Sequence, residues 1–297
     1  MPLLSGSLKK STWITENGLN QLVNQKSGKT AEFLRILLLF LRKNFKQDVS
    51  SIILFGSYAT KQNKQISDLD LLIVMKDSVD RETLHKISRN LRWLEQAVGL
   101  VKPPKGSERV LRAIEVKTGM FVCHFLCRRR DFINWRFARV FSLSRFFAKL
   151  LAPGDLVRMG FQASAITIVG EDLLSKIPHQ KPRPTQLLKS CSMNLLHAMG
   201  SLLIGILSSR ATIYSMEAVK WSLFSSYTYI TGKGAPFNEQ IAFFRRVIRK
   251  NSLLSSQLGQ LMQLREEYRP SPRFSMKAPL IIFLIHKMAI QERKSGK

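Results

Sequence analysis

Two apolar runs joined by a short polar segment, within residues 52–73, constrain this chain more than any other feature. The first run ends at Gly56 and Ser57, and the second begins with Asp68 and Asp70. Side chains alternate between the faces of a strand, so we expect both carboxylates to point the same way. Two oxygen ligands on one strand edge suit a hard cation such as Mg²⁺. A Gly-Ser turn at a helix start offers backbone N–H groups to phosphate. The pattern therefore predicts phosphoryl or nucleotidyl transfer.

This motif resembles the signature of the nucleotidyltransferase superfamily of DNA polymerase beta, in which Gly-Ser is followed at a distance by Asp-x-Asp. The matching residues are Gly56, Ser57, Asp68 and Asp70, with ten residues between the two parts. The surrounding LFGSYA and SDLDLLIV look especially like the small, mostly prokaryotic branch of the superfamily. The resemblance covers residues 30–77 most closely and extends to residue 174, and beyond that it concerns architecture alone.

The resemblance implies an enzyme that moves a nucleoside monophosphate from an NTP to an acceptor hydroxyl. Asp68 and Asp70 would bind two Mg²⁺ ions that bridge the triphosphate of the NTP substrate. One ion would lower the pKa of the acceptor hydroxyl, and the other would stabilise the departing pyrophosphate. Ser57 and the backbone at Gly56 would hold the β and γ phosphates, because a residue without Cβ permits close approach.

Enzymes of this superfamily normally supply a third carboxylate from a later strand, and three alternatives arise for it here. Glu115, on an expected strand at 109–117, could complete the catalytic set. His124, on an expected strand at 120–127, could act as a ligand or base, although neutral imidazole is a poorer Mg²⁺ ligand than carboxylate. In the third alternative the site is catalytically weak and serves to bind nucleotide.

The order of elements predicts the fold class. We expect an α/β (α+β) nucleotidyltransferase domain with a small mixed sheet at residues 30–177, followed by an all-α helical bundle at 185–290. Residues 1–29 are expected to be an N-terminal extension and 291–297 a basic tail. Three prolines within 178–184 favour an extended linker between the domains. Helices are expected at 30–45, 81–99, 185–209, 214–232, 237–250, 253–268 and 275–290, and strands at 51–55, 68–75, 109–117 and 120–127.

The charge of the chain indicates the chemistry of its partners. With 47 Lys and Arg against 20 acidic residues, its net charge is +27. Such an excess attracts polyanions and predicts RNA or another polyanion as a partner besides the nucleoside triphosphate. An RNA acceptor, including a tRNA end, is therefore attractive. A protein hydroxyl and a small antibiotic are the other acceptors considered, and the positive charge argues against a cationic antibiotic.

Basic and aromatic residues alternate in the segment 128–146, and two interpretations are open. Such a mixture can bind a phosphate backbone and stack on bases. It is equally typical of an amphipathic segment whose aromatic rings pack in the core beneath a solvated basic face.

Two function classes besides the enzyme remain open. One is a catalytically weak nucleotide- or RNA-binding module. The other is an interaction protein of the toxin–antitoxin type, whose helical bundle binds a protein partner.

Cysteine usage and hydropathy bear on the location of the protein. Cys123, Cys127 and Cys191 form no Cys-x-x-Cys pair, and the start of the chain lacks the order of a signal peptide. We expect free thiols and a cytoplasmic protein. Apolar stretches at 194–208 and 279–290 are shorter than the ~20 residues of a membrane span. They are expected to be buried helices.

Overall fold

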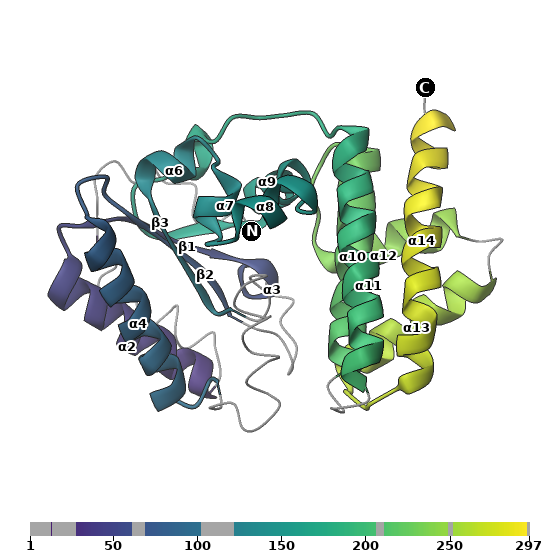
Figure 1. The fold of residues 1–297 in the computed structure, drawn as a ribbon, viewed down its shortest axis with the longest axis horizontal. Coiled ribbons are helices and arrows are strands. Elements are labelled where there is room, and N and C mark those ends of the chain that lie inside the picture. Colours follow the sequence, from purple (N-terminus) through teal and green to yellow (C-terminus); the bar gives the residue numbers. More distant parts are fainter. Residues whose placement is uncertain are drawn as a thin grey trace, which may run out of the picture. The chain divides into compact units, whose positions relative to one another are not determined.

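The structure is a computed structural model that describes residues 13, 28–60, 69–101, 122–205, 211–248 and 252–295. These residues pack as two units, which Figure 1 shows as ribbons. The first unit comprises the described residues within 1–55, 69–143 and 165–178. The second comprises those within 56–68, 144–164 and 179–297. The expected strand at 109–117 lies outside the described residues.

A four-stranded mixed sheet forms the centre of the first unit, in the order β3-β2-β1-β4. Its strands are β1 (Val49–Phe55), β2 (Asp70–Met75), β3 (His124–Arg128) and β4 (Ile166–Gly170). β1 runs antiparallel to both β2 and β4, whereas β2 and β3 are parallel. The strands β1 and β2 are buried almost throughout, as expected for strands with packed layers on both faces. The predicted small mixed sheet is confirmed.

Two details of the sheet differ from the expectations. The strand expected at 120–127 begins only at His124 and lies at an edge among the described strands. The strand β4 was not predicted. Its pairing depends on a close approach at Gly170, which has a φ of 85° and leaves no room for a Cβ beside the carbonyl of Ser50. That approach joins residues far apart in the sequence, so local periodicity does not reveal it.

The helices α2 (Gly28–Phe45) and α4 (Arg81–Ala97) lie side by side over one face of this sheet (Figure 1). One stripe of α2 is fully buried, as its apolar spacing predicts. The N-terminus of α4 is capped by Asp80, whose carboxylate accepts a hydrogen bond of 2.7 Å from the backbone N–H of Thr83. The helix ends before Gly99, whose positive φ of 73° suits a terminating residue.

Aromatic side chains pack on the other face of the sheet, where the short helices α6 (Arg129–Ile133) and α7 (Phe137–Val140) lie. The ring of Phe125 lies 5.1 Å from that of Phe141, and Phe55 lies 6.4 Å from Phe141. Trp135 and Phe141 are buried. Trp135 and Phe141 are therefore core residues, which rules out base stacking by these two rings, whereas Phe146 at the end of the segment is exposed.

The second unit is entirely helical among its described residues. Its longer helices are α9 (Gly154–Ser164), α10 (Pro184–Gly205), α11 (Ala211–Thr231), α12 (Phe237–Val247), α13 (Ser252–Glu266) and α14 (Pro272–Ser295), with the short α3 (Gly56–Ala59) and α8 (Arg145–Leu150). The helices α10, α11 and α14 pack against one another, and α9 packs against α11. Gly160 of α9 lies directly beneath the ring of Phe224, with no space for a Cβ. The predicted α-helical architecture that follows the sheet domain is confirmed.

The helix α14 is the one described helix that is long and apolar enough to cross a membrane. One of its faces packs into the bundle, and Phe274, Ile281, Ile282 and Ile285 are fully buried there. The apolar character of this stretch is thus accounted for in part by packing against α10 and α11.

The interface between α10 and α14 contains polar groups in its interior. Nε2 of His286 lies 3.2 Å from the Ser190 hydroxyl, which accepts a hydrogen bond from the side-chain amide of Asn194. Nδ1 of His286 lies 2.9 Å from the carbonyl oxygen of Ile282. All three side chains are buried. Burial lowers the pKa of His286 and of His197 to about 4, so both rings are neutral at pH 7.

Candidate active site

Asp70 is the first residue of β2 and the best-defined part of the predicted site. Its register partner in the antiparallel ladder is Phe55, the last residue of β1. Gly56 follows Phe55 directly in the chain. The residue that pairs with Asp70 is therefore the one immediately before the Gly-Ser turn. Asp70 itself is half-buried, at a strand end. Pairing of β1 with β2 therefore places the end of the strand that precedes the Gly-Ser turn beside Asp70.

Gly56 and Ser57 form the start of α3, which belongs to the second unit. Gly56 has a φ of 70°, a left-handed conformation that favours glycine. The carbonyl oxygen of Gly56 accepts a hydrogen bond from the backbone N–H of Thr60, and the Thr60 hydroxyl donates to the Ser57 carbonyl oxygen. The turn thus has a specific conformation, which explains why glycine stands at its first position. Its predicted contact with phosphate stays a prediction.

Two of the predicted catalytic residues, Asp68 and Glu115, lie outside the described residues. Among the residues that the structure describes, no group of three or more His, Cys, Asp or Glu side chains could hold a metal ion. The Mg²⁺ site on Asp68 and Asp70 therefore stays a prediction. Of its two expected ligands, the structure describes Asp70.

His124 lies on the opposite face of the sheet from Asp70. In the parallel ladder its register partner is Leu71, and neighbouring residues of a strand point to opposite faces. The ring of His124 contacts Glu95 of α4, with 2.6 Å between Nδ1 and Oε1, and both side chains are buried. This geometry does not support the alternative in which His124 acts as a ligand or base beside Asp70. The backbone N–H of Leu71 donates a hydrogen bond of 3.0 Å to the carbonyl oxygen of Cys123, the residue before His124.

The contact between His124 and Glu95 has a predicted effect on stability. Replacing Glu95 by alanine leaves a buried ring nitrogen without its partner, which costs about 3 kcal/mol. We expect faster hydrogen exchange of the β2 and β3 amides in this variant, measured by mass spectrometry. A Glu82→Ala variant on the exposed side of α4 serves as the matched control and should leave those amides unchanged. Equal exchange in both variants would show that the pair contributes nothing.

Three arginines of the segment 128–146 are neutralised within the first unit, namely Arg129, Arg136 and Arg139. Arg129 donates two hydrogen bonds of 3.1 Å to Glu171, and this interaction lowers the pKa of the Glu171 carboxyl to about 2. Arg136 and Arg139 both donate to the buried carboxylate of Asp131. Together with the buried rings of Trp135 and Phe141, these pairs favour the structural interpretation for residues 129–141, whereas Arg145 and Phe146 are exposed.

A comparison with protein families finds a match to part of this chain, mostly within the first unit. Residues 34–117 match the model described as the nucleotidyltransferase domain, a span that contains β1, the Gly-Ser turn, β2 and α4. The chain therefore carries a nucleotidyltransferase domain, and the prediction of an enzyme of this class is confirmed. Such enzymes move a nucleoside monophosphate from an NTP, and the positions of Gly56, Ser57, Asp68 and Asp70 all lie inside the matched span.

A solved structure extends the likeness of fold to most of the chain. The crystal structure of spectinomycin adenyltransferase AAD(9) from Enterococcus faecialis, with ATP and spectinomycin, matches with a TM-score of 0.55. The match covers 87% of this chain and 98% of the other chain, at 12% sequence identity. At this identity the match establishes a shared fold. A search of curated proteins finds no match.

Proposed function

We propose that this protein transfers a nucleoside monophosphate from an NTP to an acceptor hydroxyl at the site formed by Asp68, Asp70, Gly56 and Ser57. The observation that carries the proposal is the pairing of Phe55 with Asp70 inside the segment that matches the nucleotidyltransferase domain. This pairing joins the end of β1, the strand before the Gly-Ser turn, to the start of β2, the strand that carries Asp70.

The donor set fits a hard divalent cation. Asp70 offers a partly accessible carboxylate at the start of a rigid strand, and Asp68 precedes it by two residues. These two carboxylates would hold two Mg²⁺ ions, and Glu115 would supply the third carboxylate. When bound, the ions would neutralise charge on the triphosphate and lower the pKa of the acceptor hydroxyl.

The chain's own groups position the nucleotide. Gly56 lets the backbone approach the β and γ phosphates, and the Ser57 hydroxyl and nearby N–H groups donate hydrogen bonds to them. Little covalent work falls to protein side chains in such a reaction, because positioning and charge neutralisation supply most of the rate enhancement.

The proposed acceptor is RNA, such as a tRNA end. A hydroxyl of a protein is the alternative macromolecular acceptor. The net charge of +27 supports a polyanionic acceptor. A small-molecule hydroxyl is a second candidate, because the structural neighbour was solved with ATP and spectinomycin. The positive net charge of this chain argues against a cationic antibiotic as its acceptor. The three free cysteines support a reducing, cytoplasmic location.

Incubation with Mg²⁺ and NTPs labelled at the α phosphate tests the proposal. Parallel reactions contain total RNA, protein extract from which RNA has been removed, or spectinomycin as a small-molecule probe. Label on RNA supports the proposed acceptor, and label on protein or on spectinomycin replaces it with that class. The double variant Asp68→Asn/Asp70→Asn is the control for each reaction. Absence of label with every NTP and acceptor would favour the catalytically weak binding module, or the interaction protein of the toxin–antitoxin type.

A further inference from the structure

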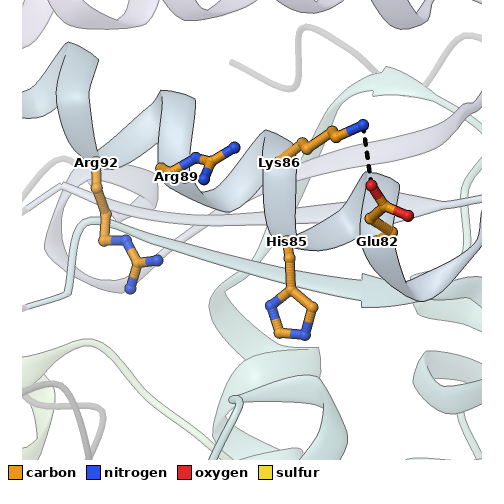
Figure 2. A pocket seen from close by; sticks show the side chains of 5 residues that line it. All are labelled: Glu82, His85, Lys86, Arg89 and Arg92. Carbon is orange, nitrogen blue, oxygen red and sulfur yellow. Dashed lines mark ion pairs between the residues drawn. The ribbon is translucent and has the colours of Figure 1, made fainter.

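The outward side of α4 carries a concentration of basic side chains next to an exposed tryptophan. We call it the basic face of α4, and it consists of Glu82, His85, Lys86, Arg89, Arg92 and Trp93. All six side chains are exposed, whereas the apolar face of the same helix is buried against the sheet. Five of them line an open hollow of about 340 Å³. Figure 2 shows these five side chains projecting from α4.

The positive charge of this face is only slightly compensated. Glu82 pairs with Lys86 at 3.1 Å, in an exposed i,i+4 contact of small energetic value. Neither Arg89 nor Arg92 forms an ion pair or hydrogen bond with any residue that the structure describes. The arginines of segment 128–146 differ in this respect, because Glu171 and Asp131 neutralise several of them. Two guanidinium groups on one helix, neither with a partner in the part of the chain that the structure describes, are available to phosphate groups.

Trp93 supplies an aromatic surface beside these charges. Its side chain is 69% exposed, and it stands four residues after Arg89, hence one helical turn further along the same side. A ring so exposed gains little from packing within the unit. Next to guanidinium groups it can stack on an unpaired base, a contact that tolerates any base sequence.

We propose that the basic face of α4 binds single-stranded nucleic acid. Arg89 and Arg92 contact successive phosphates, and Trp93 stacks on a base. An anionic membrane is a poorer match, because the apolar residues of α4 (Ile87, Leu91 and Leu94) are buried and Trp93 alone is too little for insertion. A duplex is also a poorer match, because its bases are already stacked.

This surface is distinct from the proposed active site. The helix α4 covers the sheet face toward which His124 points, whereas Asp70 lies on the other face. A nucleic acid held here would be retained by the protein independently of the reaction.

Fluorescence anisotropy with labelled oligouridylate and oligothymidylate of equal length, over a salt series, tests the charge component. We expect Arg89→Glu/Arg92→Glu to bind at least about tenfold more weakly than the control Arg273→Glu/Lys277→Glu. The control makes the same change in net charge at exposed positions of α14. The dependence of log K on log salt should fall by about 1.4 in the first variant, since each phosphate contact contributes about 0.7 for single strands. Comparison of the two oligomers decides whether RNA or DNA is preferred.

The stacking component has a separate signature. Trp93→Ala should weaken binding by about tenfold with an unchanged salt dependence, and Trp93→Phe should restore most of the affinity. Equal losses in the two charge variants would overturn the proposal, and so would full affinity in Trp93→Ala. Binding to duplex RNA or phosphatidylserine vesicles in preference to the oligomers would also overturn it. Nucleotide incorporation is measured in parallel, so loss of binding here is distinguishable from failure of the proposed reaction.

Discussion

Replacing Asp70 by asparagine is expected to reduce nucleotide incorporation by at least about 10³-fold. The substitution keeps the size of the side chain but removes the charge that would bind Mg²⁺. Charge stabilisation of a transferring phosphoryl group by a bound metal is worth several kcal/mol, and each 1.4 kcal/mol corresponds to a factor of ten in rate. The rate is measured with α-labelled NTP and the acceptor identified in the labelling experiment.

The matched control for this variant is Asp48→Asn. Asp48 precedes β1 at the end of the ladder where Val49 pairs with Met75, so it lies at the opposite end from Asp70. We expect Asp48→Asn to retain near-normal incorporation and Asp68→Asn to lose it. A rate in Asp70→Asn equal to that of the control would remove the Asp-x-Asp motif from the mechanism. Glu115→Gln then tests the third carboxylate separately.

Acid should destabilise the second unit strongly at pH values where carboxylates are still ionised. Burial lowers the pKa of His197 and His286 from 6.5 to about 4 in the folded chain. As the pH falls, the histidines of the unfolded chain bind protons at a higher pH than those of the folded chain. The contribution of the two histidines to the free energy of unfolding is therefore fully present above pH 6.5 and is lost as the pH falls toward 4. A shift of this size corresponds to about 3 kcal/mol for each histidine.

Urea unfolding followed by hydrogen exchange in α10 and α14 measures this loss between pH 7.5 and 4. A His286→Asn variant should be less stable at pH 7.5 but should lose roughly half as much additional stability on acidification. The exposed His85, replaced in the same way, is the control and should leave the pH dependence unchanged. Parallel curves for the wild type and His286→Asn would contradict the assignment of this titration to His286.

The parts of the fold with strong local signals could be predicted from the sequence. The strands β1 and β2 follow from apolar runs bounded by turn residues, and the long helices follow from apolar residues at helical spacing. The helix expected at 81–99 is α4, which ends at Ala97 shortly before the positive φ of Gly99. The strand β4 could not be predicted in the same way, since its five residues are stabilised by pairing with β1 and by the close approach of Gly170 to Ser50.

The site was predictable to the extent that it depends on spacing. The separation of Gly56 from Asp70 is a property of the sequence. Two strands joined by a segment this short can pair antiparallel, as β1 and β2 do. The direction of His124 depends on register, because the partner of Leu71 points away from Asp70. The periodicity of the sequence does not show how β3 is aligned with β2, so the direction of His124 could not be predicted.

The arginine-rich segment illustrates a different limit. An arginine adjacent to an aromatic residue has the same sequence pattern whether the pair binds a phosphate or packs in a core. Only the fold shows that Asp131 neutralises Arg136 and Arg139, and that Arg89 and Arg92 have no such partner among the described residues. Neutralisation depends on residues that are distant in the sequence.

The fit of Gly160 beneath Phe224 has a consequence for dividing this protein into fragments. The helix α9 precedes the proline-rich segment 178–184 in the chain but belongs to the unit formed mostly by residues after that segment. A protease cut or gene truncation within 178–184 would leave α9 on the amino-terminal fragment, severed from the ring that covers it. A single crossover upstream of residue 144 would instead separate β4 from its partner β1, because residues 165–178 belong to the first unit, so shuffling such halves among homologous enzymes would divide one unit or the other.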